Sequence, residues 1–185
     1  MFKYVKHLNY PVNIKKKDLK MAKYILTQLG GPNGELGASL RYFCQKFTMP
    51  DDYGRALLND IATEELGHVE MISSIVHSLI KDASTQELEE AGLGSYFVNH
   101  NKGIYPVDST GVPFTASYFA VTANPLADLM EDMAAEEKAR ATYENLIDLA
   151  TDKDLIGILL FLRQREIVHF NRFKELYLYY KEKGY

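Results

Sequence analysis

Apolar residues recur at intervals of three and four along most of the chain, which is the spacing of one face of an α-helix. A leading helix is predicted to start at Asp18, a residue type that caps helices, and to end at the glycines that follow Leu29. Four further helices are predicted, over about residues 35–47, 50–81, 126–150 and 155–183. Nothing in the pattern predicts a sheet, so the sequence predicts an all-α protein.

Pro50, Asp51 and Asp52 are typical of a helix start, because proline suits the first turn and acidic side chains stabilise the positive end of the helix dipole. The break before the last helix is predicted at residues 151–154.

Two segments fall outside this helical pattern. Residues 1–14 alternate loosely between apolar and polar types and include Pro11, so we expect an extended arm that packs on the domain or on a neighbouring subunit. Residues 82–124 contain several glycines and prolines and are predicted to form one long connection. With 185 residues, 46% of them hydrophobic, the chain suits one globular domain over residues 1–185, in which residues 1–34 are the arm and leading helix.

The sequence also contains an internal repeat with a constant offset. Five pairs of identical residues are each separated by 101 positions: Glu35 and Glu136, Ala38 and Ala139, Tyr42 and Tyr143, Glu65 and Glu166, and His68 and His169. The chain therefore consists of two helical hairpins, each with E-x6-Y on its first helix and E-x-x-H on its second.

Each E-x-x-H pair places a carboxylate and an imidazole on one helix face. Glu65 and His68 interrupt an apolar stripe, where a carboxylate is costly unless it is paired, hydrogen-bonded or bound to metal. Two such helices, with one glutamate from each of two others, form the dinuclear site of ferritin-like bundles, whose second and third helices are joined by a long crossover. We therefore predict a ferritin-like four-helix bundle in which residues 82–124 are the crossover. Its metal-ligating candidates are Glu35, Glu65, His68, Glu136, Glu166 and His169.

The remaining candidates near this site are open to two interpretations. Tyr42 and Tyr143 lie seven residues after a candidate glutamate, where a tyrosine serves either as ordinary core packing or as a phenol that orients a ligand carboxylate. Glu64, Glu70 and Glu137 are expected to point outward or to serve as partners of the ligands. The other histidines, His7, His77 and His100, are expected to be structural or exposed.

Residue types and net charge indicate which metals, partners and locations suit the chain. Carboxylates and imidazoles suit manganese or iron and disfavour copper. A net charge of −4 with scattered basic residues argues against a nucleic-acid partner. No apolar run approaches the roughly 20 residues of a membrane span, and the N-terminus lacks the apolar region of a signal peptide. Cys44 is the only cysteine, which fits an intracellular location.

Long motifs resemble the manganese-containing catalases over essentially the whole chain. They span residues 30–35, 64–72, 111–114, 134–136 and 165–169. Residues 10–12, 91–94 and 136–143 resemble in particular the short spore-coat branch of that family.

The resemblance implies two manganese ions per chain that disproportionate hydrogen peroxide to water and dioxygen by cycling between Mn(II) and Mn(III). It implies that Glu65 bridges both metals, that Glu35 and His68 complete one, and that Glu136 and His169 complete the other. Glu166 then stands just outside the ligands and moves protons, with Tyr42 as a further candidate for the chemistry. The resemblance also implies a homo-oligomer, with a hexamer favoured, and a place in the spore coat.

Two alternatives remain open at this point. One is a di-iron peroxidase or ferroxidase, although the chain has no C-x-x-C pair for a rubredoxin-like electron donor. The other is a structural spore-coat protein that contacts other coat proteins and keeps a low-activity or vestigial site.

Overall fold

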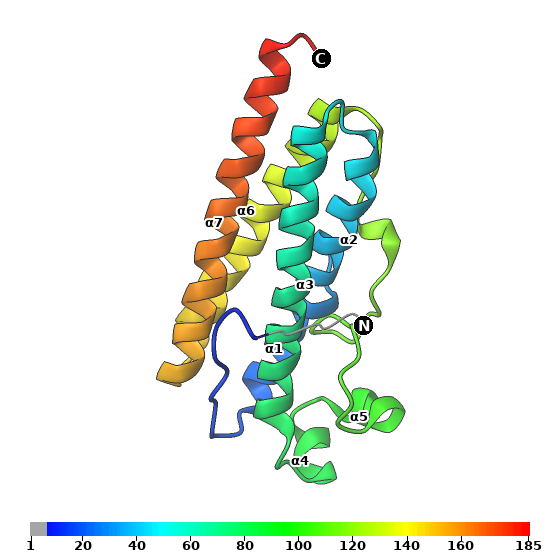
Figure 1. The fold of residues 1–185 in the computed structure, drawn as a ribbon. Coiled ribbons are helices and arrows are strands. Elements are labelled where there is room, and N and C mark those ends of the chain that lie inside the picture. Colours follow the sequence, from blue (N-terminus) through cyan, green and yellow to red (C-terminus); the bar gives the residue numbers. More distant parts are fainter. Residues whose placement is uncertain (1–6) are drawn as a thin grey trace, which may run out of the picture.

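The computed structural model describes residues 7–185, and its long helices form an elongated bundle (Figure 1). The α-helices are α1 (Leu19–Gly30), α2 (Glu35–Gln45), α3 (Asp52–Ile80), α4 (Thr85–Glu90), α5 (Gly94–His100), α6 (Pro125–Leu149) and α7 (Lys153–Glu182). Short 3-10 turns occupy Lys46–Thr48 and Ala116–Tyr118. The described residues contain no β-strand, so the prediction of an all-α fold is confirmed.

Side-chain caps fix where most of the long helices begin. The Asp18 carboxylate accepts a hydrogen bond from the backbone N–H of Met21, as predicted, and Asn124 and Asp152 cap α6 and α7 in the same way. The predicted place of Pro50 in the first turn of α3 is wrong. Asp51 is the cap, since its side chain accepts the N–H of Gly54 at 3.0 Å, and Pro50 therefore lies one residue before it.

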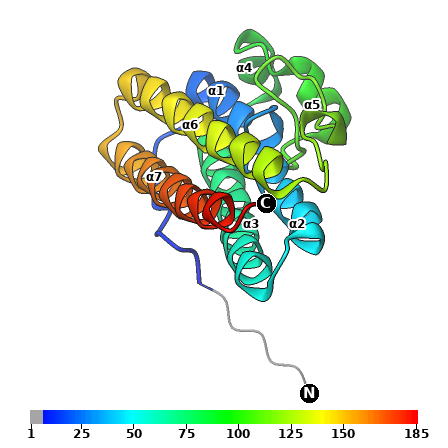
Figure 2. The same cartoon turned by 90° about the horizontal axis from the view of Figure 1, so that it is seen from above.

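The four bundle helices are α2, α3, α6 and α7. Figure 1 shows α3 and α6 running in one direction and α2 and α7 in the other, and Figure 2 shows the four helices around a common axis. Because α3 and α6 are parallel, the chain between them must return along the whole bundle, and residues 82–124 make this crossover as predicted.

The crossover also holds two short helices, α4 and α5, which the hydrophobic pattern did not predict. A signal for α4 was present, because Ser84 and Glu87 form a capping box at its start. Farther along, the backbone at Pro106 and Val107 passes so close to Gly30 that a Cβ atom there would lie 2.4 Å from the carbonyl carbon of Pro106. Glycine at the end of α1 therefore lets the crossover lie against the bundle.

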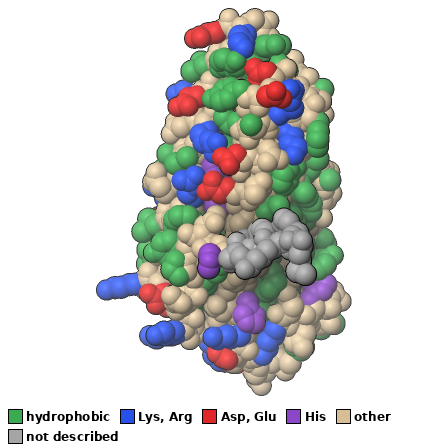
Figure 3. All heavy atoms as spheres, in the orientation of Figure 1, with side chains coloured by type: hydrophobic (Ala, Val, Ile, Leu, Met, Phe, Trp, Pro, Cys, Tyr) green, Lys and Arg blue, Asp and Glu red, His purple; other side chains and the backbone are tan. Residues whose placement is uncertain are grey.

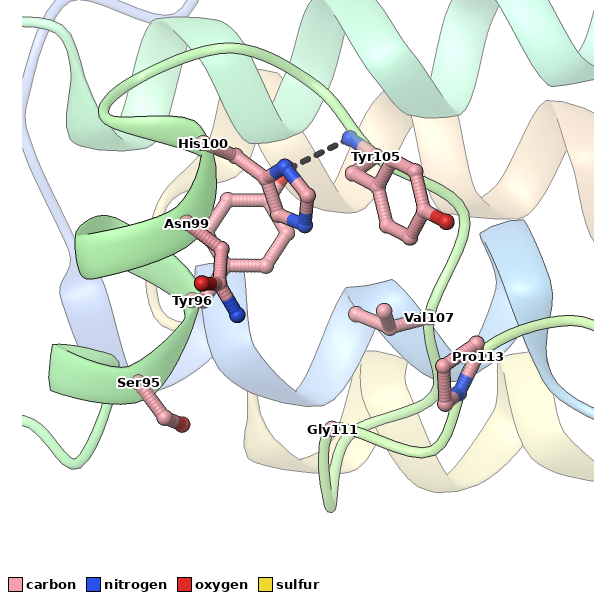
Figure 4. A pocket seen from close by; sticks show the side chains of 8 residues that line it. All are labelled: Ser95, Tyr96, Asn99, His100, Tyr105, Val107, Gly111 and Pro113. Atoms are coloured by element: carbon pink, nitrogen blue, oxygen red, sulfur yellow. Dashed lines mark hydrogen bonds between the residues drawn. The ribbon is translucent and has the colours of Figure 1, made fainter.

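A pocket in the crossover is lined by residues of α5 and of the loop after it (Figure 4). The Tyr105 N–H donates to the Tyr96 hydroxyl, which donates to the Gly103 carbonyl, both at 2.6 Å. The His100 ring stacks on Tyr105 with centroids 4.0 Å apart. His100 therefore has a structural role, and none of the predicted metal ligands lines this pocket.

The described part of the predicted arm, residues 7–14, packs on the bundle. Tyr10 contacts Phe161 of α7 with ring centroids 5.2 Å apart, and Ile14 is buried in the core. The rest of the arm lies outside the described residues. Basic and acidic side chains are intermingled on the face seen in Figure 3. Within residues 7–185, none of the helices combines the length and the apolar character that crossing a membrane requires.

The bundle interior contains two separate apolar cores. The core that lies lower in Figure 1 joins α1 to the second half of α3 and the first half of α7, around residues such as Ile25, Ile75 and Leu159. The core that lies higher in that view joins the first half of α3 to the second half of α7, around Leu58, Phe173 and Tyr180. Between the two cores, α3, α6 and α7 bury a layer of polar side chains, and this polar layer contains the predicted metal site.

Candidate metal centre

The polar layer is built from four helices, each of which contributes one or two acidic or imidazole side chains. Glu35 is the first residue of α2, and Glu136 lies near the middle of α6. The two E-x-x-H pairs lie on α3 and α7. All six candidate side chains are at most 2% exposed: Glu35, Glu65, His68, Glu136, Glu166 and His169.

Glu65 lies at the centre of this group, between the two histidines. Its Oε2 atom is 2.8 Å from Nδ1 of His68, and its Oε1 atom is 2.6 Å from Nδ1 of His169. The two imidazole rings are stacked, with centroids 5.8 Å apart. A single carboxylate therefore presents one oxygen to each histidine, which is the arrangement that a bridging ligand requires.

Two outer carboxylates complete a nearly symmetric set. Glu35 lies 3.6 Å from Nδ1 of His68, and Glu136 lies 3.7 Å from Nδ1 of His169. Glu65 and Glu166 belong to both halves, because each half forms a four-residue cluster whose potential ligand atoms all lie within 4.8 Å of one another. The geometry thus brings all six predicted residues together, while the role of Glu166 as ligand or proton carrier stays a prediction.

The two repeated tyrosines connect the halves. The Tyr42 hydroxyl donates to Oε1 of Glu136, and the Tyr143 hydroxyl donates to Oε1 of Glu35. Both phenols are completely buried. Of the two interpretations of these tyrosines, the hydrogen bonds favour phenols that orient the carboxylates, and each phenol comes from the opposite hairpin.

Glu64 is the partner of both histidines, a role that sequence reasoning left open. Its carboxylate lies 3.2 Å from Nε2 of His169 and 3.7 Å from Nε2 of His68, and it accepts two hydrogen bonds from Arg165. Glu64 therefore lies on the Nε2 side of both rings, and Nδ1 of each ring faces the centre of the site. Glu64 and Arg165 are themselves separated by 101 residues, so the repeat contained a signal for this pair.

Charges inside the layer shift several pKa values strongly. Burial and the neighbouring Glu65 carboxylate raise the pKa of Glu35 to about 8, and burial with three nearby carboxylates raises the pKa of Glu166. Burial alone would lower the pKa values of His68 and His169, but Glu65 and the neighbouring carboxylates together outweigh it and raise them. The surplus of carboxylates therefore holds protons, and it would hold metal cations for the same reason.

The donor set fits a pair of hard divalent metals. Buried atoms without a hydrogen-bond partner include Oε1 of Glu65, Oε2 of Glu136 and Oε1 of Glu166. Nδ1 of His169 is likewise buried and without a hydrogen-bond partner. Such atoms are costly in a protein interior unless they coordinate a cation. Carboxylate oxygens with two imidazoles suit manganese or iron.

Manganese binding is expected to strengthen as the pH rises. Because the pKa values of Glu35 and both histidines are raised, these groups bind protons in the metal-free protein that a metal must displace. Between pH 6 and pH 7 the affinity should rise by about tenfold for each displaced proton. Calorimetric titration of the metal-free protein with Mn²⁺ in buffers of different ionisation enthalpy measures both quantities. An affinity that does not change with pH would contradict this charge balance.

Comparisons with known proteins all give one family. The family model described as manganese containing catalase matches residues 1–183. Protein CotJC of Bacillus subtilis strain 168 is 52% identical over 95% of this chain and 92% of its own length. A manganese catalase of Bacillus subtilis is 34% identical over 93% of this chain and 68% of its own length. The crystal structure of KatB, a manganese catalase from Anabaena, superposes with a TM-score of 0.86 at 36% identity and covers 95% of this chain and 79% of that one.

Proposed function

Because this chain belongs to the manganese-containing catalase family, we propose that it converts two molecules of hydrogen peroxide into two of water and one of dioxygen at a dimanganese site. The observation that carries the proposal is the Glu65 carboxylate, which faces both histidines from the centre of a buried polar layer. We assign Glu35, Glu65 and His68 to one metal, and Glu65, Glu136 and His169 to the other. Two manganese ions per chain follow from this assignment.

When bound, the manganese pair supplies two-electron exchange with peroxide. The protein side chains supply orientation and proton transfer. Tyr42 and Tyr143 fix the outer carboxylates through their hydroxyl groups, and the Glu64 carboxylate lies beside Nε2 of both imidazoles. Glu166 has a raised pKa and no partner for its Oε1 atom, so it is suited to take a proton from one peroxide and return it to the other.

The test is a combined measurement of metal content and oxygen release. Protein produced in manganese-rich medium is expected to contain two manganese ions per chain and to release one dioxygen for every two peroxides consumed, as followed with an oxygen electrode. Protein that carries two manganese ions but releases no oxygen would refute the catalase proposal. A preparation that is active only with iron would instead support the peroxidase or ferroxidase alternative.

A second function is a structural one in the spore coat, and the similarity to CotJC over nearly the whole chain favours it. The two functions are compatible, because a coat protein that removes peroxide acts where it is assembled. If the manganese-loaded protein releases no oxygen, the structural function stands alone, and other coat proteins become its expected partners.

We expect the chain to form a homo-oligomer, with a hexamer favoured. The crossover keeps apolar side chains exposed, among them Val98 and Val112, and exposed apolar surface of this kind is usually covered by a subunit contact. Sedimentation velocity at micromolar concentration measures the state directly. A monomer under those conditions would contradict this prediction.

A further inference from the structure

A narrow cavity reaches the polar layer between α2 and α6. Its walls include the small side chains Ala135 and Ala139, and three candidate carboxylates, Glu35, Glu136 and Glu166, also line it. It is wide enough for about one water-sized molecule. Hydrogen peroxide has one oxygen atom more than water, so the substrate of the proposed function enters this cavity with a small shift of its walls.

Arg41 of α2 is the one cationic side chain among the described residues that line the cavity. Its side chain is only 2% exposed, and its Nε–H group has no hydrogen-bond partner. The nearest acid is Glu131, whose Oε1 atom lies 3.3 Å from that nitrogen outside hydrogen-bond geometry. A buried guanidinium with an unused donor is unusual, because removing a charge from water is costly unless an opposite charge and hydrogen-bond acceptors replace the water.

The surroundings hold this guanidinium in place. Its central carbon lies 6.0 Å from the Tyr42 ring and 5.9 Å from the ring of Phe119, a residue of the crossover. The buried carboxylate of Asp132 lies within its electrostatic reach, and neither oxygen of Asp132 has a hydrogen-bond partner. The crossover is fixed beside them, since the Gln45 side chain donates to the Ala120 carbonyl at 3.2 Å. Arg41 therefore has a defined position beside the cavity.

We propose that Arg41 is a substrate-positioning residue, whose guanidinium donates a hydrogen bond to peroxide in this cavity and gives the cavity affinity for small monovalent anions. This inference rests on the proposed catalase function. A guanidinium only donates hydrogen bonds, whereas an ionised carboxylate only accepts them. A peroxide molecule, which does both, fits between Arg41 and the carboxylates. Without Arg41, the carboxylates would repel any anion that approached.

The experiment compares manganese-loaded wild-type protein with Arg41→Gln and Arg41→Lys. Azide, a small linear anion, is titrated by calorimetry, and peroxide turnover is measured in parallel. Losing one charge-assisted hydrogen bond should weaken azide binding by roughly 10- to 100-fold in Arg41→Gln. The KM for peroxide should rise more than kcat falls, and Arg41→Lys should recover part of the loss. Two manganese ions per chain in every variant exclude an effect through metal binding.

Two further variants separate positioning from charge and from folding. Arg140→Gln removes the same charge from α6 at a surface residue that pairs with Glu137 and Glu144, and it should change nothing. The double variant Arg41→Gln with Asp132→Asn removes one basic and one acidic side chain, so Asp132 is not left as a buried acid without the neighbouring guanidinium. We expect azide binding to stay weak in the double variant.

Azide affinity equal to that of the wild type, in either Arg41→Gln or the double variant, would overturn the proposal. If the wild-type protein instead binds azide through Arg41 but releases no oxygen, the proposed catalase function fails and the anion site at Arg41 stands.

Discussion

Replacing Glu65 with glutamine is expected to remove most of the manganese and, with it, the peroxide turnover. Glu65 faces Nδ1 of both histidines, so the change takes a negative charge away from both proposed metals at once. Changes outside the ligand shell commonly cost about 10- to 100-fold in metal affinity, and the loss of a bridging ligand should exceed that. Elemental analysis and the oxygen electrode measure the two losses on the same sample.

The fold of the Glu65→Gln variant should survive. The two apolar cores lie on either side of the polar layer and do not include Glu65, and a neutral amide costs less to bury than a carboxylate without its cations. Circular dichroism should show unchanged helix content. The matched control is Glu137→Gln, which alters an exposed carboxylate beside Glu136 and should leave metal content and turnover unchanged. Two manganese ions in Glu65→Gln would refute the bridging assignment.

Glu166→Gln is expected to keep both manganese ions and to lose turnover. A carboxylate that carries protons contributes typically about 100- to 10,000-fold to a rate, and glutamine cannot replace it because it does not titrate in this range. The side chain is buried, and burial together with Glu35, Glu136 and Glu65 raises its pKa, which suits a group that exchanges protons. Turnover and metal content of the purified variant decide the outcome.

Together, the two glutamine variants distinguish the two symmetric positions. The repeat treats Glu65 and Glu166 as equivalents, and both belong to both clusters of potential ligand atoms. If Glu166→Gln loses manganese as Glu65→Gln does, Glu166 is a direct ligand and the centre keeps its two-fold symmetry. If only turnover falls, the two halves have taken different roles.

The sequence predicted the long helices well because a bundle helix repeats its buried positions every three or four residues. It also predicted which residues meet in the polar layer. A carboxylate such as Glu65 within an apolar stripe is costly to bury unless it is paired, hydrogen-bonded or bound to metal. The constant 101-residue offset then identified Glu35 and Glu136. The membership of the chain in the manganese-containing catalases confirms the resemblance stated from its motifs.

Other features could not be read from the pattern. α4 and α5 are too short to show a helical period, and only local capping marks α4. Arg41 and Asp132 are charged residue types that are usually exposed, and their burial results from how α2, α6 and the crossover pack in three dimensions. The contact of Tyr42 with Glu136, rather than with Glu35 of its own helix, likewise depends on helix packing.

The ion pair between Glu64 and Arg165 has a consequence for the origin of the chain. These residues occupy the same place in the two hairpins and face each other. A protein assembled from two identical hairpins would place the same residue at both positions, either acid against acid or base against base. Covalent fusion of two hairpins removes this restriction, since each copy then mutates independently. The salt bridge is thus available to unlike hairpins, such as the two halves of a fused chain, and it marks a position where the repeated halves differ.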